Sequence, residues 1–154
     1  MNGHLHINVN SLERKHENKH EKYEYFVRKL AEGGAGGCTV AQYEIPPGKS
    51  AYPYHYHVKD EEAFYILSGK GLLRTPDGEK EVSAGEFLYF PAGEAGAHKI
   101  TNISKTENFV YLDFDIKNDL DVCLYPDSGK FGIWGKGIDK CYKSEQAVDY
   151  YDGE

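Results

Sequence analysis

Short apolar runs alternate with turn-forming residues along most of the chain, a pattern typical of strands. The runs are rich in Val, Ile, Leu, Phe and Tyr, and clusters such as Pro46-Pro47-Gly48 and Pro76-Asp77-Gly78 separate them. Strands are expected at residues 38–45, 54–58, 62–67, 72–75, 80–82, 87–90, 97–103 and 108–114. Short strands at this spacing predict an all-β sandwich, jelly roll or small barrel.

The segments before this region have weaker patterns. Residues 1–10 alternate in a weakly strand-like way, and residues 23–30 fit either a strand or a short helix. Residues 11–22 are almost wholly charged and polar, which indicates a solvated helix or loop. The glycine-rich stretch at 33–37 is interpreted as a flexible turn.

The tail changes character again after residue 119. It has a turn at 125–130, followed by an apolar group that we expect to fold back on the barrel or on a partner subunit. The pattern therefore predicts an N-terminal extension at 1–37 that packs on the barrel, a barrel at 38–116 and a C-terminal extension at 117–154.

Composition narrows the class of protein. A chain of 154 residues fits one domain, and 13 tyrosines and 17 glycines against one methionine favour strands over a helical bundle. The net charge of −7 argues against a nucleic-acid partner, which would need clustered Lys and Arg. No apolar run is long enough for a bilayer, and the N-terminus lacks a signal-peptide core. We therefore expect a soluble, cytoplasmic protein without a membrane partner, whose three cysteines are reduced.

The first candidate metal ligands in the sequence are His55 and His57. Alternate residues of a strand point to the same face, so both imidazoles can reach one ion. The acidic turn that follows returns a carboxylate, from Glu61 or Glu62, toward the same place. His98 is the best candidate for a fourth ligand.

Two segments resemble the paired motifs of the cupin superfamily. The first has a glycine at 48, His55 and His57, then four residues to Glu62 and six more to Gly69. The second runs from Gly85 through Pro91-Ala92-Gly93 to His98 and, after three more residues, Asn102. The spacing to the second glycine selects Glu62 over Glu61. Compared with the family pattern, the loop before His98 is two residues longer and the gap before His55 is one longer, both where insertions are tolerated.

The resemblance implies a double-stranded β-helix, or jelly-roll, barrel that holds one divalent metal ion with His55, His57, Glu62 and His98. The tail looks like that of a subgroup of single-domain cupins that carry Tyr-Pro-Asp-Ser and mostly lack an assigned reaction. Zinc, manganese, iron and nickel are all compatible with these ligands. Metal binding requires neutral imidazoles, so affinity is expected to fall as pH drops through the histidine range.

Strand alternation also selects neighbours of the metal. If Glu62 points inward, so do Phe64 and Ile66, which would form an apolar wall of a substrate pocket. Arg74 fits either a pocket clamp for a substrate anion or an exposed position beside the next turn. In the strand at 108–114, Val110, Leu112 and Phe114 are expected to face the core, which leaves Asp113 and Asp115 to face solvent. No general acid or base stands out.

The opposite face of the strand at 62–67 is also apolar, so a second layer is expected to cover it, either the N-terminal segment or another subunit. We predict a homodimer. For function we expect a metal-dependent enzyme that acts on a small polar molecule, a sugar derivative or an organic acid, by isomerisation, decarboxylation or oxygenation. The alternative is a non-catalytic small-molecule-binding or sensor protein with the same barrel.

Overall fold

The computed structural model of the protein describes residues 4–33 and 37–154, and its regular structure is almost entirely β. Within these residues the helical segments are short 3-10 turns: η1 (Val9–Ser11), η2 (Glu94–Gly96), η3 (Pro126–Ser128) and η4 (Ser144–Gln146). The strands are β1 (Lys15–His20), β2 (Tyr23–Ala31), β3 (Cys38–Ile45), β4 (Tyr56–His57), β5 (Glu61–Ser68), β6 (Lys70–Thr75), β7 (Gly78–Ser83), β8 (Phe87–Phe90), β9 (Lys99–Asn102), β10 (Phe109–Ile116), β11 (Leu120–Tyr125), β12 (Lys130–Gly135) and β13 (Ile138–Lys143).

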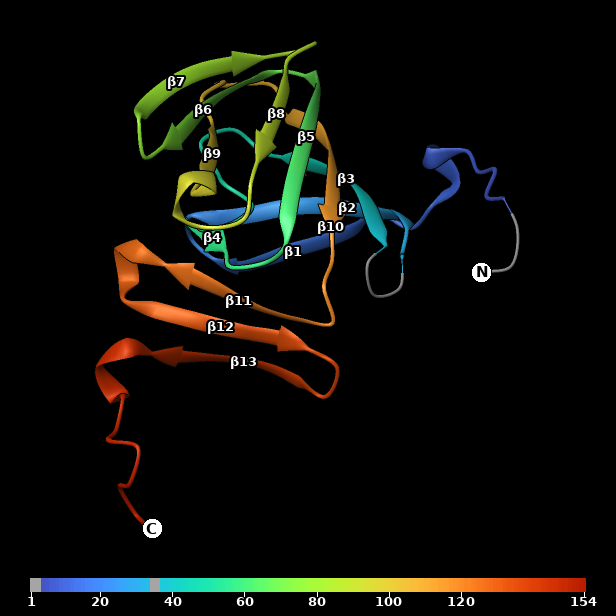
Figure 1. The fold of residues 1–154 in the computed structure, drawn as a ribbon. Coiled ribbons are helices and arrows are strands. Elements are labelled where there is room, and N and C mark those ends of the chain that lie inside the picture. The colour runs from blue at the N-terminus through green and yellow to red at the C-terminus, as the bar shows by residue number, and fades with distance from the viewer. Residues whose placement is uncertain (1–3, 34–36) are drawn as a thin grey trace.

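Three sheets build the molecule. The largest has six strands in the order β1-β2-β3-β10-β5-β8, and the others have the orders β13-β12-β11-β4 and β7-β6-β9. Figure 1 shows the tail strands β11 to β13, orange to red, as a ladder beside the barrel, with β4 next to β11. The tail therefore extends a sheet of the barrel, and it joins that sheet through the strand that carries His57.

A backbone bridge links the ends of the two smaller sheets. His55 and His98 form an isolated antiparallel bridge in which each backbone N–H donates to the other residue's carbonyl, at 3.1 and 2.9 Å. This bridge connects the segment before β4 to the segment before β9. Two histidines that are far apart in the sequence are thus held side by side by backbone hydrogen bonds.

The core lies between the layers and follows strand alternation. On β10 the buried positions are Phe109, Tyr111 and Asp113, while Val110 and Leu112 are only partly buried. The expectation that Val110 and Leu112 form the core face, and that Asp113 faces solvent, is wrong. The buried face of β10 carries Asp113 and Asp115 beside its aromatic residues, so hydrophobicity alone selected the opposite, wholly apolar face.

Most expected strands are present, and β3 and β8 have the expected bounds. Residues 15–20 are a strand, not the helix or loop expected for 11–22, because β1 pairs along β2 at the sheet edge, where charged side chains stay solvated. The described residues before Val9 contain no strand, and part of the glycine turn at 33–37 lies outside the described residues. No helix in the described part of the chain is long and apolar enough to span a membrane.

Candidate metal centre

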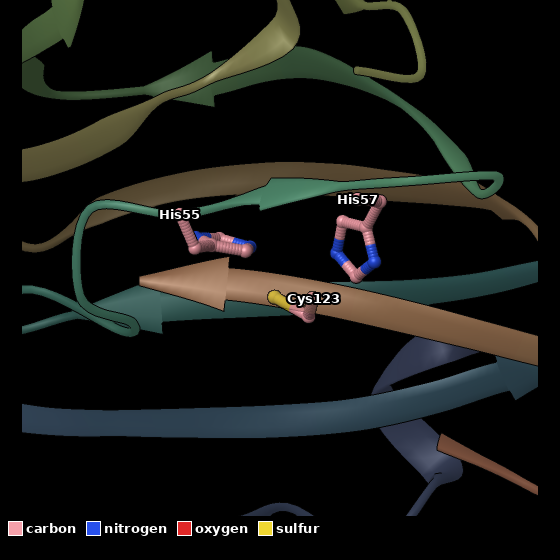
Figure 2. A group of neighbouring side chains, drawn as sticks. All are labelled: His55, His57 and Cys123. Atoms are coloured by element: carbon pink, nitrogen blue, oxygen red, sulfur yellow. The ribbon is translucent and has the colours of Figure 1, made fainter. Parts of the chain in front are cut away.

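Backbone geometry brings His55 and His57 to one side of the cavity. His55 is fixed by its bridge to His98, and His57 follows two residues later on the same face of the strand. Their ring centroids lie 5.3 Å apart. Figure 2 shows the two rings above Cys123, which comes from β11.

Glu62 faces these rings from the opposite sheet. It is 8% exposed, and its Oε2 lies 3.7 Å from His55 Nε2, 3.5 Å from His57 Nε2 and 3.3 Å from His98 Nε2. Glu61 directly precedes Glu62 on β5 and therefore points to the opposite, outer face of the sheet, where it forms a hydrogen bond with Tyr89. Of the two acidic residues, the structure brings Glu62 to the histidines.

His98 reaches the group from a loop with an added turn. The four residues between Gly93 and His98 include the 3-10 turn η2, and Gly93 N–H donates to the carbonyl of His57 at 2.7 Å. The His98 ring is 2% exposed and stacks on Phe90, with centroids 3.6 Å apart. The longer loop therefore folds as a compact turn and leaves His98 next to His55.

The three imidazoles share one orientation, in which Nδ1 faces a fixed hydrogen-bond acceptor. The acceptors are Pro53 O at 2.8 Å from His55, Asp121 Oδ2 at 2.6 Å from His57, and Gly96 O at 2.9 Å from His98. Because a neutral imidazole that donates from Nδ1 has its lone pair on Nε2, all three Nε2 atoms present lone pairs toward Glu62.

A divalent cation fits this donor set. Glu62 Oε2 and His98 Nε2 are buried and have no hydrogen-bond partner, which is costly unless something else satisfies them. Burial lowers the pKa of His55 to about 4 and also lowers the pKa of His98, so both imidazoles stay neutral, as metal binding requires. Three imidazole nitrogens and one carboxylate suit zinc, manganese, iron or nickel.

Asp121 is a residue of the candidate site that the sequence did not reveal. It is 2% exposed on β11 and accepts hydrogen bonds from His57 Nδ1 and from the backbone N–H of Lys59, the latter at 2.8 Å. Burial opposes its ionisation, but these hydrogen bonds prevail and lower its pKa. Asp121 is therefore an anion that orients His57.

Substitution of Asp121 by asparagine should weaken metal binding about 10- to 100-fold, the usual effect of losing a carboxylate partner of a ligating histidine. The amide can still accept from the Lys59 N–H, so the fold should persist. Competition with a chromogenic chelator would measure the affinity. An unchanged dissociation constant would contradict the orienting role, and Asp127→Asn, at an exposed aspartate paired with Arg74, is the matched control.

The pH dependence of binding is expected to come mainly from Glu62. Burial raises the pKa of Glu62, so the metal-free site holds a proton there that the metal must displace. Affinity should therefore fall as pH drops through this raised pKa, whereas protons compete at His55 only near pH 4. Calorimetry in two buffers of different ionisation enthalpy, repeated at several pH values, should detect protons released on metal binding, with more released at lower pH. Binding without proton release would contradict this prediction.

A cavity of about 230 Å³ opens beside the candidate ligands. Its lining comes from both the barrel and the tail: Tyr43, Tyr52, His55, His57, Glu62, Asp113, Asp115, Lys117, Cys123, Tyr125 and Trp134. Asp113 and Asp115 thus face the cavity instead of solvent. Cys123 Sγ lies within 4.8 Å of a ring nitrogen of both His55 and His57, and burial raises its pKa to about 12, so it is a neutral thiol.

The three expected pocket residues have different positions. Phe64 is buried behind the cavity and is not part of its lining; its ring centroid lies 5.4 Å from that of His98, in an edge-to-face contact. Ile66 is fully buried in the core and does not line the cavity. Arg74 is also outside it, because its guanidinium stacks over Tyr54 and donates two hydrogen bonds to Asp127, at 2.7 and 2.9 Å.

This fold and site define a β-barrel protein with a candidate metal centre, and comparison with known proteins gives its family. Residues 41–115 match the family model described as a cupin domain. Residues 41–115 therefore form a cupin domain, and the chain has the double-stranded β-helix fold.

Solved structures resemble the chain over most of its length. One is described as a candidate sugar phosphate isomerase from Acidithiobacillus ferrooxidans, with 27% identity, a TM-score of 0.79 and coverage of 92% of this chain and 91% of that chain. A sugar phosphate isomerase of the cupin superfamily from Silicibacter pomeroyi has 18% identity, a TM-score of 0.81 and coverage of 96% and 98%. A predicted oxalate decarboxylase from Thermotoga maritima has 22% identity, a TM-score of 0.65 and coverage of 73% and 98%.

One curated protein is also similar in sequence. It is an uncharacterised protein of Methanocaldococcus jannaschii, 41% identical over 66 residues, which are 42% of this chain and 50% of that protein. The chain thus spans about half the length of the curated relative that it matches.

Proposed function

We propose that the protein is a metal-dependent enzyme that binds one divalent ion through His55, His57, Glu62 and His98 and acts on a small polar metabolite. The supporting observation is the approach of three Nε2 atoms to one carboxylate oxygen, at 3.3 to 3.7 Å, beside an open cavity. The substrate is a sugar derivative or an organic acid. The reaction is an isomerisation, a decarboxylation or an oxygenation, and the solved structures described as isomerases and as a decarboxylase support the first two types.

A bound ion with positions open to substrate or water would supply Lewis-acid or redox chemistry. Side chains of the protein orient the metal ligands and line the cavity beside the proposed ion. Asp121 fixes the ring of His57, while Asp113 and Asp115 provide carboxyl groups on the same side of the cavity as Glu62. Tyr125 and Trp134 add aromatic side chains from the tail to the lining of the cavity.

Elemental analysis of protein purified without chelators or immobilised nickel tests this proposal. We expect about one equivalent of a transition metal per chain, as a single site of four ligands implies. Iron or manganese would favour oxygenation or decarboxylation, and zinc would favour isomerisation. Protein that contains no metal, and takes up none on addition, would contradict the proposal.

A homodimer in the cytoplasm is part of the same proposal. The outer patch, defined as Tyr65, Leu67, Phe87 and Tyr89, leaves four large apolar side chains 41 to 63% exposed on neighbouring strands β5 and β8. Exposed apolar patches of this kind are typical of subunit interfaces. The three free cysteines agree with a reducing compartment.

We also propose the division into a barrel at 38–116 with extensions at 1–37 and 117–154.

Sedimentation of the wild-type protein at micromolar concentration should give the mass of a dimer. Phe87→Asp should shift the equilibrium to monomer, because it places a charge in the outer patch. Val148→Asp is the matched control, since Val148 is 72% exposed in the tail, outside the patch. A wild-type protein that sediments as a monomer would refute the homodimer.

A further inference from the structure

Asp113 is a buried polar group with an unmet hydrogen bond. Its side chain lines the cavity and the residue is 6% exposed, yet its Oδ1 has no partner. One of its oxygens lies within 4.8 Å of carboxylate oxygens of both Glu62 and Asp115. A carboxyl group in this position is costly unless a ligand supplies the missing hydrogen bond.

Apart from the proposed metal ion, the cavity lining offers no unpaired cationic side chain to balance an anionic ligand. Within the cavity lining, the one Lys or Arg side chain is Lys117, and its Nζ forms an ion pair with Asp115 Oδ2 at 3.0 Å. Arg74, which could have bound a phosphate group, is held by Asp127 outside the cavity. A phosphate ester would therefore place its charge beside carboxyl groups without the arginine or free lysine that usually binds phosphate.

Hydroxyl groups fit this lining better. A hydroxyl both donates and accepts, so it can satisfy a carboxyl oxygen whichever partner supplies the hydrogen. The lining adds the aromatic surface of Trp134, which suits the carbon-bound hydrogens of a sugar ring. These groups match a ligand that is rich in hydroxyls and carries no charge.

We propose that the cavity binds a neutral polyhydroxylated molecule, an unphosphorylated sugar or polyol, with one hydroxyl hydrogen-bonded to Asp113. The proposal rests on the proposed function and selects a substrate class within it. It sets this protein apart from a sugar phosphate isomerase, because specificity comes from the lack of a free arginine or lysine in the cavity lining as well as from the unpartnered carboxyl group.

The test uses the full chain, because its single tryptophan, Trp134, lines the cavity and its fluorescence reports on binding there. The metal-loaded protein would be titrated with matched probes: D-glucose against glucose 6-phosphate, D-fructose against fructose 6-phosphate, and D-mannose against mannose 6-phosphate. We expect at least one neutral sugar to bind about tenfold more tightly than its phosphate, the factor that 1.4 kcal/mol represents.

Substitutions of Asp113 test its contribution to sugar binding separately from metal binding and folding. Asp113→Leu should weaken binding of that sugar about tenfold or more by removing the hydrogen bond, while Asp113→Asn, which keeps a donor and an acceptor, should retain most of the affinity. Circular dichroism and metal content would be measured on the same samples. The proposal is overturned if the phosphates bind more tightly, if no probe binds, or if folded Asp113→Leu binds like the wild type.

Measuring the metal content distinguishes failure of this ligand proposal from failure of the proposed function. Metal-containing protein that prefers phosphates overturns only the choice of ligand class. Protein that takes up no metal contradicts the proposed function, and the sugar titration of that protein still decides whether Asp113 recognises neutral hydroxyls.

Discussion

A variant with alanine at His98 is expected to lose metal, with an affinity more than about 100-fold below that of the wild type, since even outer partners of metal ligands contribute 10- to 100-fold. His98 is 2% exposed, and its Nε2 lies 3.3 Å from Glu62 Oε2 with no other partner. Without this ring, Glu62 faces two imidazoles instead of three. The double variant His57→Ala, His98→Ala should contain no metal above background.

Loss of packing must be separated from loss of the ligand. The His98 ring stacks on Phe90 and contacts Phe64, so alanine also leaves a cavity that costs about 2 to 4 kcal/mol of unfolding free energy. His98→Gln retains most of the volume but not the imidazole, and should lose metal with a smaller change in stability. His6→Ala, at an exposed histidine outside the strands, is the matched control. Folded His98→Gln that binds metal like the wild type would show that His98 is not a ligand.

Those residues of the candidate site whose positions follow from strand alternation or from motif spacing were predictable from the sequence. His55 and His57 share a face because the side-chain period of a strand is two, and the spacing to Gly69 selected Glu62 over Glu61. Motif spacing also supplied His98 despite its longer loop. The sequence did not show why the longer loop before His98 is tolerated. The structure gives the reason: the added residues fold as the 3-10 turn η2.

Residues that approach the site from distant strands were missed. Asp121 and Cys123 reach it because β11 pairs with β4 in a register that sets Cys123 opposite His57. No local pattern encodes this pairing of segments 66 residues apart. Asp113 was misplaced for another reason: the opposite face of β10 is wholly apolar and was taken as the core face, although the face that holds Asp113 is the buried one.

The glycine at 96 is the second position where a small change should have a large effect. A Cβ added there would lie 1.9 Å from the carbonyl oxygen of Pro91 and 3.0 Å from its carbonyl carbon, a backbone clash that no side-chain movement relieves. The carbonyl of Gly96 accepts the Nδ1–H bond of His98 at 2.9 Å, so the loop cannot shift without turning that ring. Gly96→Ala should therefore lose about 1 to 3 kcal/mol of unfolding free energy through overpacking.

Its metal affinity should also fall, about tenfold or more, because the loop fixes both the orientation and the tautomer of His98. Ala95→Ser is the matched control, since Ala95 is exposed in the same 3-10 turn. Thermal unfolding with and without added metal separates the two effects: overpacking lowers the midpoint in both conditions, whereas misorientation of His98 reduces the increase that the metal produces. If Gly96→Ala lowers stability but keeps the full increase on metal addition, the turn η2 serves only packing, and the orientation of His98 is set by its bridge to His55 and its stacking on Phe90.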